Sequence, residues 1–215
     1  VPPEHLEAIK RFIAFLRKNQ RDKAISALLQ HSRIPQKEPS TFDDFSRVTG
    51  EHAAQKEIFE SDSAILKTEY SFIGPPGVGK RIYQWHMVMP VAKGLKAYFI
   101  KATERNEKFT KARRTGTESS AISGLVRPSC LIIDEIAEAS STWKHPSVFD
   151  MIDEDCSKEG PNCMIFTSNL TPNKWRDFFR EEDSLLCALD RTFDAATVYL
   201  MKGESYRGRN LKLIR

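Results

Sequence analysis

Hydrophobic residues at the start of the chain recur at helical spacing. Between residues 3 and 30 they follow one another at steps of three and four, which places them along one face of an α-helix. They are Leu6, Ile9, Ile13 and Leu16, with Phe12 and Phe15 widening the apolar stripe. A second short helix is expected at about residues 22–31, where Ile25, Leu28 and Leu29 recur. The pattern therefore predicts a small pair of helices.

The same segment is rich in basic residues. They are Lys10, Arg11, Arg17, Lys18, Arg21 and Lys23. Two interpretations stay open: a helical pair with a solvated basic face, or a surface that binds a partner or DNA. Further on, Pro35, Pro39 and Gly50 favour a linker or entry loop. We therefore assign residues 1–36 to a basic helical N-terminal segment and residues 37–66 to a linker and leading helix.

From residue 69 the pattern changes to short apolar runs that alternate with helical stretches. Five runs predict strands, at residues 69–74, 97–102, 130–135, 163–169 and 197–201. A helix is expected over residues 79–93, ending before Gly94. Strands that alternate with helices predict a parallel, doubly wound α/β sheet, here in one domain over residues 67–215. Ligands bind beyond the carboxyl ends of the strands in such sheets.

The composition is typical of a soluble globular protein, since 40% of the residues are hydrophobic and 29% are charged. No apolar run reaches the roughly 18 residues of a membrane span, and charges interrupt the N-terminal stretch, so no signal peptide is expected. We therefore expect a cytoplasmic protein without a membrane partner. The net charge of +4 permits a nucleic-acid partner without demanding one. The four cysteines lack CxxC spacing and are expected to be free thiols.

A glycine-rich stretch follows the first predicted strand and precedes a predicted helix. It reads GPPGVGKR and comprises Gly74, Pro75, Pro76, Gly77, Val78, Gly79, Lys80 and Arg81. Its glycines let backbone N–H groups face phosphate oxygens, and Lys80 adds a positive charge for the β and γ phosphates. The stretch therefore predicts an ATP-binding loop. Its last position departs from the pattern, because Arg81 stands where Ser or Thr is expected.

Polar residues end two further predicted strands. In LIIDE, Asp134 is suited to hold Mg²⁺, directly or through water, and Glu135 to orient or deprotonate an attacking water. In FTSN, Asn169 could sense the γ-phosphate and position that water. For either motif alone, a solvent-facing acid pair or a local turn explains the pattern equally well.

Two arginines near the end of the sequence complete the candidate site. Arg191 lies between an apolar helix face and the last predicted strand, and Arg207 follows that strand in a turn. A guanidinium in either place could stabilise charge on a phosphoryl group in transfer. Taken singly, each arginine is better explained as a surface residue that aids solubility.

Four motifs follow one another along the chain in the order GPPGVGK, LIIDE, FTSNLTPNKW and LDR…GESYR. Together they resemble the motifs of AAA+ ATPases of the DnaC/IstB type, which are helicase loaders and transposition helpers. RIPQ at residues 33–36 and TFDDF at residues 41–45 resemble the segment that precedes the ATPase core in that family. The resemblance spans about residues 33–208. The first 30 residues carry no motif that it assigns.

The resemblance implies a P-loop NTPase (AAA+) three-layer α/β core with a mainly parallel five-stranded sheet and little or no helical lid. It implies a homo-oligomeric ring or filament that binds ATP and Mg²⁺ between neighbouring subunits. Asn169 resembles the first sensor of the family. Arg191 resembles the arginine finger that reaches into a neighbour's site, and Arg207 resembles the second sensor, which acts in its own site.

A basic stretch, EKFTKARRTG, lies between the second and third predicted strands. It contributes Lys108, Lys111, Arg113 and Arg114, with Phe109 interleaved. Basic residues beside an aromatic can follow the phosphates of DNA and stack a base, and the resemblance implies that this region faces a central channel. The alternative is a solvated, charged helix face.

Two functions follow from these patterns. The first is a DNA-associated AAA+ ATPase that assembles on DNA and recruits or loads a partner, either a transposase or a replicative helicase. The second is a pseudo-ATPase scaffold, in which nucleotide binds but is hydrolysed poorly. Arg81 motivates the second, because a guanidinium donates hydrogen bonds but has no acceptor with which to coordinate Mg²⁺.

Overall fold

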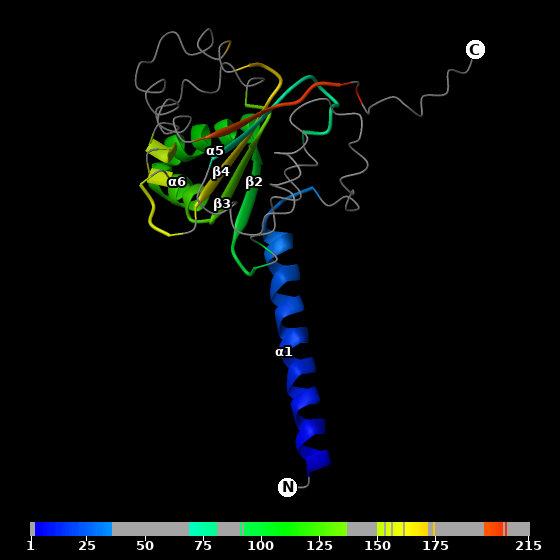
Figure 1. Cartoon of the computed structure of the whole chain (residues 1–215). Coiled ribbons are helices and arrows are strands. Elements are labelled where there is room, and N and C mark those ends of the chain that lie inside the picture. The colour runs from blue at the N-terminus through cyan, green and yellow to red at the C-terminus, as the bar shows by residue number, and fades with distance from the viewer. Residues whose placement is uncertain are drawn as a thin grey trace, which may run out of the picture.

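The fold is described from a computed structural model of the chain (Figure 1). It describes residues 3–35, 69–80, 91, 93–136, 150–152, 154–155, 157–160, 162–171, 174, 196–203 and 205. The expected leading helix before residue 67 and most of the expected helix over 79–93 lie outside these residues. So do Arg81, Arg191 and Arg207.

The described residues form a sheet of five parallel strands. The strands are β1 (Tyr70–Ile73), β2 (Ala97–Lys101), β3 (Cys130–Asp134), β4 (Cys163–Ser168) and β5 (Thr197–Leu200). Their order across the sheet is β2-β3-β4-β1-β5. All five predicted strands are confirmed. The chain leaves β1 for the far edge of the sheet and returns through β3 to β4, so the direction of winding changes beside β1, where α/β sheets form their ligand crevices.

Side chains of the strands alternate between two hydrophobic clusters, one on each face of the sheet. On one face, Leu131 and Ile133 of β3 pack with helices α5 (Ala102–Thr115) and α6 (Glu118–Val126). On the other, Ile132 packs in a cluster against which the end of helix α1 (Pro3–His31) lies. Every residue of β3 is buried. Helices thus cover both faces, and the predicted three-layer P-loop architecture is confirmed.

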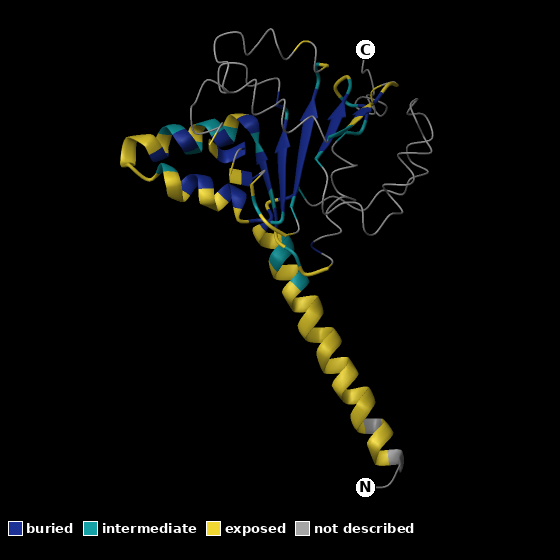
Figure 2. Cartoon of the chain, turned by 60° about the vertical axis from the view of Figure 1, so that its left-hand side comes forward, coloured by how far each residue is buried: buried dark blue, intermediate teal, exposed yellow. Residues whose placement is uncertain are grey.

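Helices α5 and α6 form a hairpin that projects from the sheet (Figure 2). Gly116 joins them at a φ of 66°, a left-handed conformation that favours glycine. The buried face of α5 includes Arg105, whose pKa burial lowers to about 9, and Phe109, which is fully buried in the core. The expectation that Phe109 stacks a nucleic-acid base is therefore wrong, because its ring is part of the hydrophobic core.

Helix α1 is one continuous helix of 29 residues rather than the expected pair. No proline or glycine occurs between residues 4 and 31, and the polar stretch around Asn19 continues the helix instead of ending it. Only its last turns pack on the core, through Ile25, Leu28 and Leu29. The rest projects away from the sheet, as Figures 1 and 2 show. No helix among the described residues is long and apolar enough to cross a membrane.

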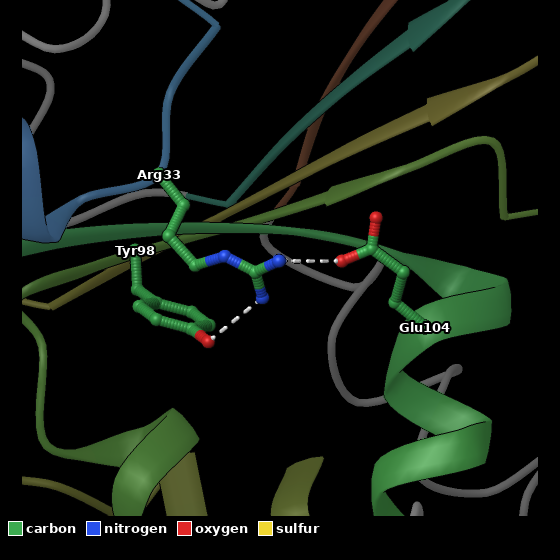
Figure 3. Close-up of polar contacts among 3 residues, drawn as sticks. All are labelled: Arg33, Tyr98 and Glu104. Carbon is green, nitrogen blue, oxygen red and sulfur yellow. Dashed lines mark hydrogen bonds and ion pairs between the residues drawn. The ribbon is translucent and has the colours of Figure 1, made fainter.

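The chain that leaves α1 is fixed to the edge of the sheet. The backbone N–H of Phe99 in β2 donates a hydrogen bond of 2.7 Å to the carbonyl of Ser32. Arg33 has a φ of 58°, and its guanidinium donates to the Tyr98 hydroxyl at 3.3 Å and to Glu104 Oε2 at 3.1 Å (Figure 3). These contacts connect α1 to β2 and to the start of α5.

Candidate nucleotide-binding site

The glycine-rich loop begins directly after β1. Gly77 and Gly79 have φ values of 83° and 96°, which other residues adopt only with strain. Gly74 and Gly77 are also tightly packed, since a Cβ atom at Gly74 would overlap the carbonyl oxygen of Met201 and one at Gly77 would overlap the Ser205 hydroxyl. The loop therefore lies against the chain that follows β5, and the GESYR motif reaches the phosphate loop through Ser205.

Lys80 links the loop to the neighbouring strand. Its Nζ donates hydrogen bonds to the carbonyl of Gly74, to the carbonyl of Pro75 at 2.7 Å and to Asn169 Oδ1 at 2.7 Å. The pairing of β1 with β4 explains this contact, because Ile73 lies opposite Ser168 and both strands end at the same edge. The structure thus brings together the loop lysine and the candidate first sensor.

Asp134 ends β3 and is 3% exposed. Thr167 Oγ1 in β4 donates a hydrogen bond of 2.6 Å to Asp134 Oδ1 and accepts one of 2.9 Å from the N–H of Glu135. Glu135 has a left-handed φ of 61°, and the next residue, Ile136, donates its N–H to the Thr167 carbonyl at 2.9 Å. Thr167 therefore fixes both acids, a role that the sequence did not reveal. The role depends on the in-register pairing of β3 and β4, which a single sequence does not reveal.

Glu135 also forms an ion pair that the sequence analysis missed. Lys101 Nζ lies 3.8 Å from Glu135 Oε2, and both side chains are partly exposed. Lys101 ends β2 and lies opposite Asp134 in the strand register. At this distance and exposure the pair contributes little to stability. Its effect is on orientation, because it holds the Glu135 carboxylate at the β2 side of the site.

The donor set fits a nucleotide with a magnesium ion. Loop N–H groups and Lys80 suit phosphate oxygens, and the carboxylate of Asp134 is a hard oxygen ligand of the kind Mg²⁺ binds. Within the described parts of the chain, His, Cys, Asp and Glu form no cluster of three or more that could hold a metal alone. Mg²⁺ needs none, since it is held by one or two carboxylates together with substrate phosphates and water.

The candidate DNA-binding residues lie on the α5–α6 hairpin. Lys111, Arg113 and Arg114 are exposed. Lys108 is half-buried, with its Nζ 5.5 Å from the centre of the Tyr98 ring. The hairpin thus presents cations without an exposed aromatic, because Phe109 is buried.

A second polar group lies at the opposite, amino-terminal edge of the sheet. Asp155 is 1% exposed, and burial raises its pKa to about 6 although Asn162 donates to its Oδ2 at 3.1 Å. Cys130 and Cys163 face each other in β3 and β4 as buried free thiols. A side-chain hydrogen bond with Cys130 and burial raise the pKa of Cys163, so this thiol is inert rather than nucleophilic.

The family profile of the IstB-like ATP binding proteins matches residues 7–213. The chain belongs to this family. The match begins inside α1, well before residue 33, so the family profile includes most of the N-terminal helix and the expectation that the resemblance begins at residue 33 is too narrow.

Several relatives of the chain are named for insertion sequences. The chain is 26% identical, over 89% of its own length and 76% of the relative, to the protein named as the ATP-binding protein of insertion sequence IS5376 of Geobacillus stearothermophilus. It is 28% identical, over 95% of its length and 82% of the relative, to Rv3427c of Mycobacterium tuberculosis, which is named as an ATP-binding protein in an insertion sequence. It spans only 51% of a third such relative, from Sinorhizobium fredii.

Solved structures share the fold. DnaI matches with a TM-score of 0.55 and 17% identity, over 70% of this chain and 81% of its own. The DnaC helicase loader matches with a TM-score of 0.54 and 12% identity, over 80% and 97%. Domain III of DnaA from Thermotoga maritima gives a TM-score of 0.56 and 15% identity, over 78% and 69%. These likenesses show that the chain shares the fold of these proteins.

Replacing Thr167 tests its role as the residue that positions both acids. Thr167→Val keeps the shape but leaves Asp134 and the Glu135 N–H without this partner, so we expect a loss of about 1–3 kcal/mol in the free energy of unfolding and slower ATP hydrolysis at unchanged ATP affinity. Thr167→Ser retains the hydroxyl and should restore both properties. Chemical denaturation and steady-state turnover measure them. A valine variant as stable and active as the wild type contradicts the role.

Asp155 predicts a pH dependence of stability. Its folded-state pKa of about 6 exceeds the unfolded value of about 3.9, so the native state binds the proton more tightly and stability falls as pH rises from about 4 to about 6. Asp155→Asn removes this dependence and should stabilise the protein at pH 7.5 by up to about 3 kcal/mol. Thermal unfolding across pH measures the effect. Equal stability of the two proteins at pH 7.5 rules it out.

Proposed function

We propose that this protein is a AAA+ ATPase that binds ATP with Mg²⁺, assembles on DNA and recruits the transposase of its insertion sequence. The contact of Lys80 with Asn169, beside the group formed by Asp134, Thr167 and Glu135, carries the proposal in a chain of the IstB-like ATP binding family. A transposase is favoured over a replicative helicase because the relatives are named for insertion sequences, whereas the likeness to helicase loaders is one of fold.

Each residue described in the candidate site has a part in this proposal. Lys80 and the loop N–H groups bind the β and γ phosphates, and Asp134, oriented by Thr167, holds Mg²⁺. Bound Mg²⁺ would neutralise charge on the phosphates. Glu135 orients the attacking water, and its ion pair with Lys101 restrains it. Asn169 senses the γ-phosphate, because its amide already lies within hydrogen-bond distance of Lys80.

Assembly completes the proposed site. Arg191 would act on the nucleotide of a neighbouring subunit in a homo-oligomeric ring or filament, and Arg207 on the nucleotide of its own subunit. The contact of Ser205 with Gly77 supports the second assignment, since it brings the chain close to the phosphate loop only two positions before Arg207.

A nucleotide-gated scaffold with weak hydrolysis is the second candidate function. The observation that favours it is Arg81, which replaces the hydroxyl residue that ordinarily binds Mg²⁺ and competes with the metal by its charge. ATP binding would then control assembly, and turnover would be slow.

For DNA, the exposed cations of the α5–α6 hairpin support contacts to phosphates. Lys111 and Arg114 lie on the face of α5 opposite its buried residues, where both can reach a backbone. The buried ring of Phe109 leaves no stacking platform beside them. We therefore infer binding that depends on charge rather than on base stacking.

Measuring ATP turnover with and without DNA separates the two candidate functions. If Arg81 weakens metal binding, the wild type binds ATP but turns it over slowly, and Arg81→Thr raises the turnover number at least about tenfold, which corresponds to about 1.4 kcal/mol in the barrier. The Arg81→Thr/Glu135→Gln double variant should lose that gain, and Lys80→Ala should lose ATP binding. Fast, Mg²⁺-dependent turnover by the wild type refutes the scaffold.

Binding of single-stranded and duplex DNA across salt concentrations tests the hairpin. Lys111→Ala and Arg114→Ala should each weaken binding and lower the slope of log affinity against log salt by about 0.7–0.9, the value for one lost phosphate contact. Lys93→Ala removes an exposed cation from the turn before β2 and is the matched control. Fluorescence anisotropy gives the affinities. Unchanged slopes in both hairpin variants would place the DNA elsewhere.

A further inference from the structure

The projecting part of α1 exposes a row of large apolar side chains. At about 100° per residue, Leu6, Ile9, Ile13 and Leu16 fall within one sector of about 80°, and they are 43–49% exposed. Phe12, at the edge of this sector, is 61% exposed. Soluble monomers rarely expose a large contiguous apolar surface without a binding role.

A groove lies at the foot of the same helix. It has a volume of about 620 Å³ and runs between the end of α1, the start of β2 and the end of α6. Its lining is mostly small or apolar and includes Ala24, Ala27, Tyr98, Gly124 and Pro128.

The exposed row and the groove are continuous. By the same helical geometry, Ala24, Ala27 and His31, which line the groove, occupy the sector of Leu6 to Leu16. From Leu6 to His31 the track is about 38 Å long at 1.5 Å per residue. The residues that fix α1 to the core, Ile25, Leu28 and Leu29, are centred about 130° away around the helix, and Leu28, the nearest of them, also lines the groove. The centre of the exposed row therefore lies on a different face of α1 from the centre of the core-packing residues.

One edge of the track is basic. Lys10, Arg17 and Arg21 follow one another along the same side of α1, next to the apolar sector. Around the groove the basic residues are His31, Lys96 and Arg127. Gln20 interrupts the apolar row, Lys23 borders its other edge, and Asp22 lies on the far side of α1. A straight, narrow apolar track with a basic edge is complementary to an amphipathic α-helix that carries acidic residues along one side.

We propose that this track, formed by the exposed face of α1 and the groove at its foot, binds an acidic-edged amphipathic helix of the transposase. The proposal rests on the proposed function, which it extends by naming the recruiting surface. A second copy of α1 fits the track less well. In an antiparallel pair, Lys10, Arg17 and Arg21 of both copies would meet, and in a parallel pair the second ATPase core, attached from Ser32 onward, would enter the same space.

Photo-crosslinking of the full chain with purified transposase and ATP identifies the occupant. Benzoylphenylalanine in place of Phe12 probes the row, and in place of Arg127 it probes the groove. In place of Lys18, which is exposed on the far side of α1, it serves as the matched control. We expect transposase adducts from the first two positions and none from the third. Adducts between two copies, bonds within one chain only, or equal labelling from Lys18 overturn the proposal.

Affinity for the transposase tests the track quantitatively. Ile9→Ser/Ile13→Ser and Arg17→Glu should each weaken binding at least about tenfold, whereas Lys18→Glu, the adjacent cation on the other face, should change it less than about twofold. ATP affinity and helix content by circular dichroism should stay constant in all variants. If the wild type binds transposase and the track variants bind equally well, only the docking surface fails. If the wild type does not bind the transposase, the proposed recruitment of the transposase fails together with the docking surface.

Discussion

The parallel pairing of β1 with β4 is the constraint on which the candidate site depends. The two strands are far apart in the sequence, and their pairing sets the glycine-rich loop beside the end of FTSN, where Gly74 N–H donates to the Ser168 carbonyl at 3.1 Å. The contact of Lys80 with Asn169 follows from that register. The next pairing, of β3 with β4, adds the two acids through Thr167. One edge of one sheet thus collects the groups proposed to bind phosphate, to hold the metal and to orient water, from three separate motifs.

Much of this arrangement could be predicted from the sequence, for a physical reason. Buried strands of a parallel sheet are short apolar runs bounded by polar ends, and the glycine-rich loop has strict conformational requirements that few other sequences meet. The five strands, the layered fold and the polar ends of β1, β3 and β4 were therefore recognisable. The family resemblance then supplied roles for Asn169, Arg191 and Arg207 that spacing alone does not give.

The failures have equally physical causes. The single helix α1 was divided in two because a polar stretch was interpreted as a break, although no residue there disfavours helix. Phe109 was interpreted as exposed because its neighbours are basic, whereas helical periodicity turns it inward with Ala102, Arg105 and Ala112. The contacts of Thr167 and Lys101 escaped notice because they depend on strand register, which one sequence without its pairing partners does not display.

Gly74 and Gly77 differ in the substitutions that their neighbouring groups allow. At Gly77 the neighbouring group is a side chain, that of Ser205, and at Gly74 it is the backbone carbonyl of Met201. A backbone atom is the same in every residue, so no substitution at position 201 can make room for a side chain at position 74. A smaller residue at position 205 therefore makes room at position 77, within the limit that the positive φ of Gly77 imposes. Position 74 has no such coupled partner, and its glycine is fixed by the course of the main chain.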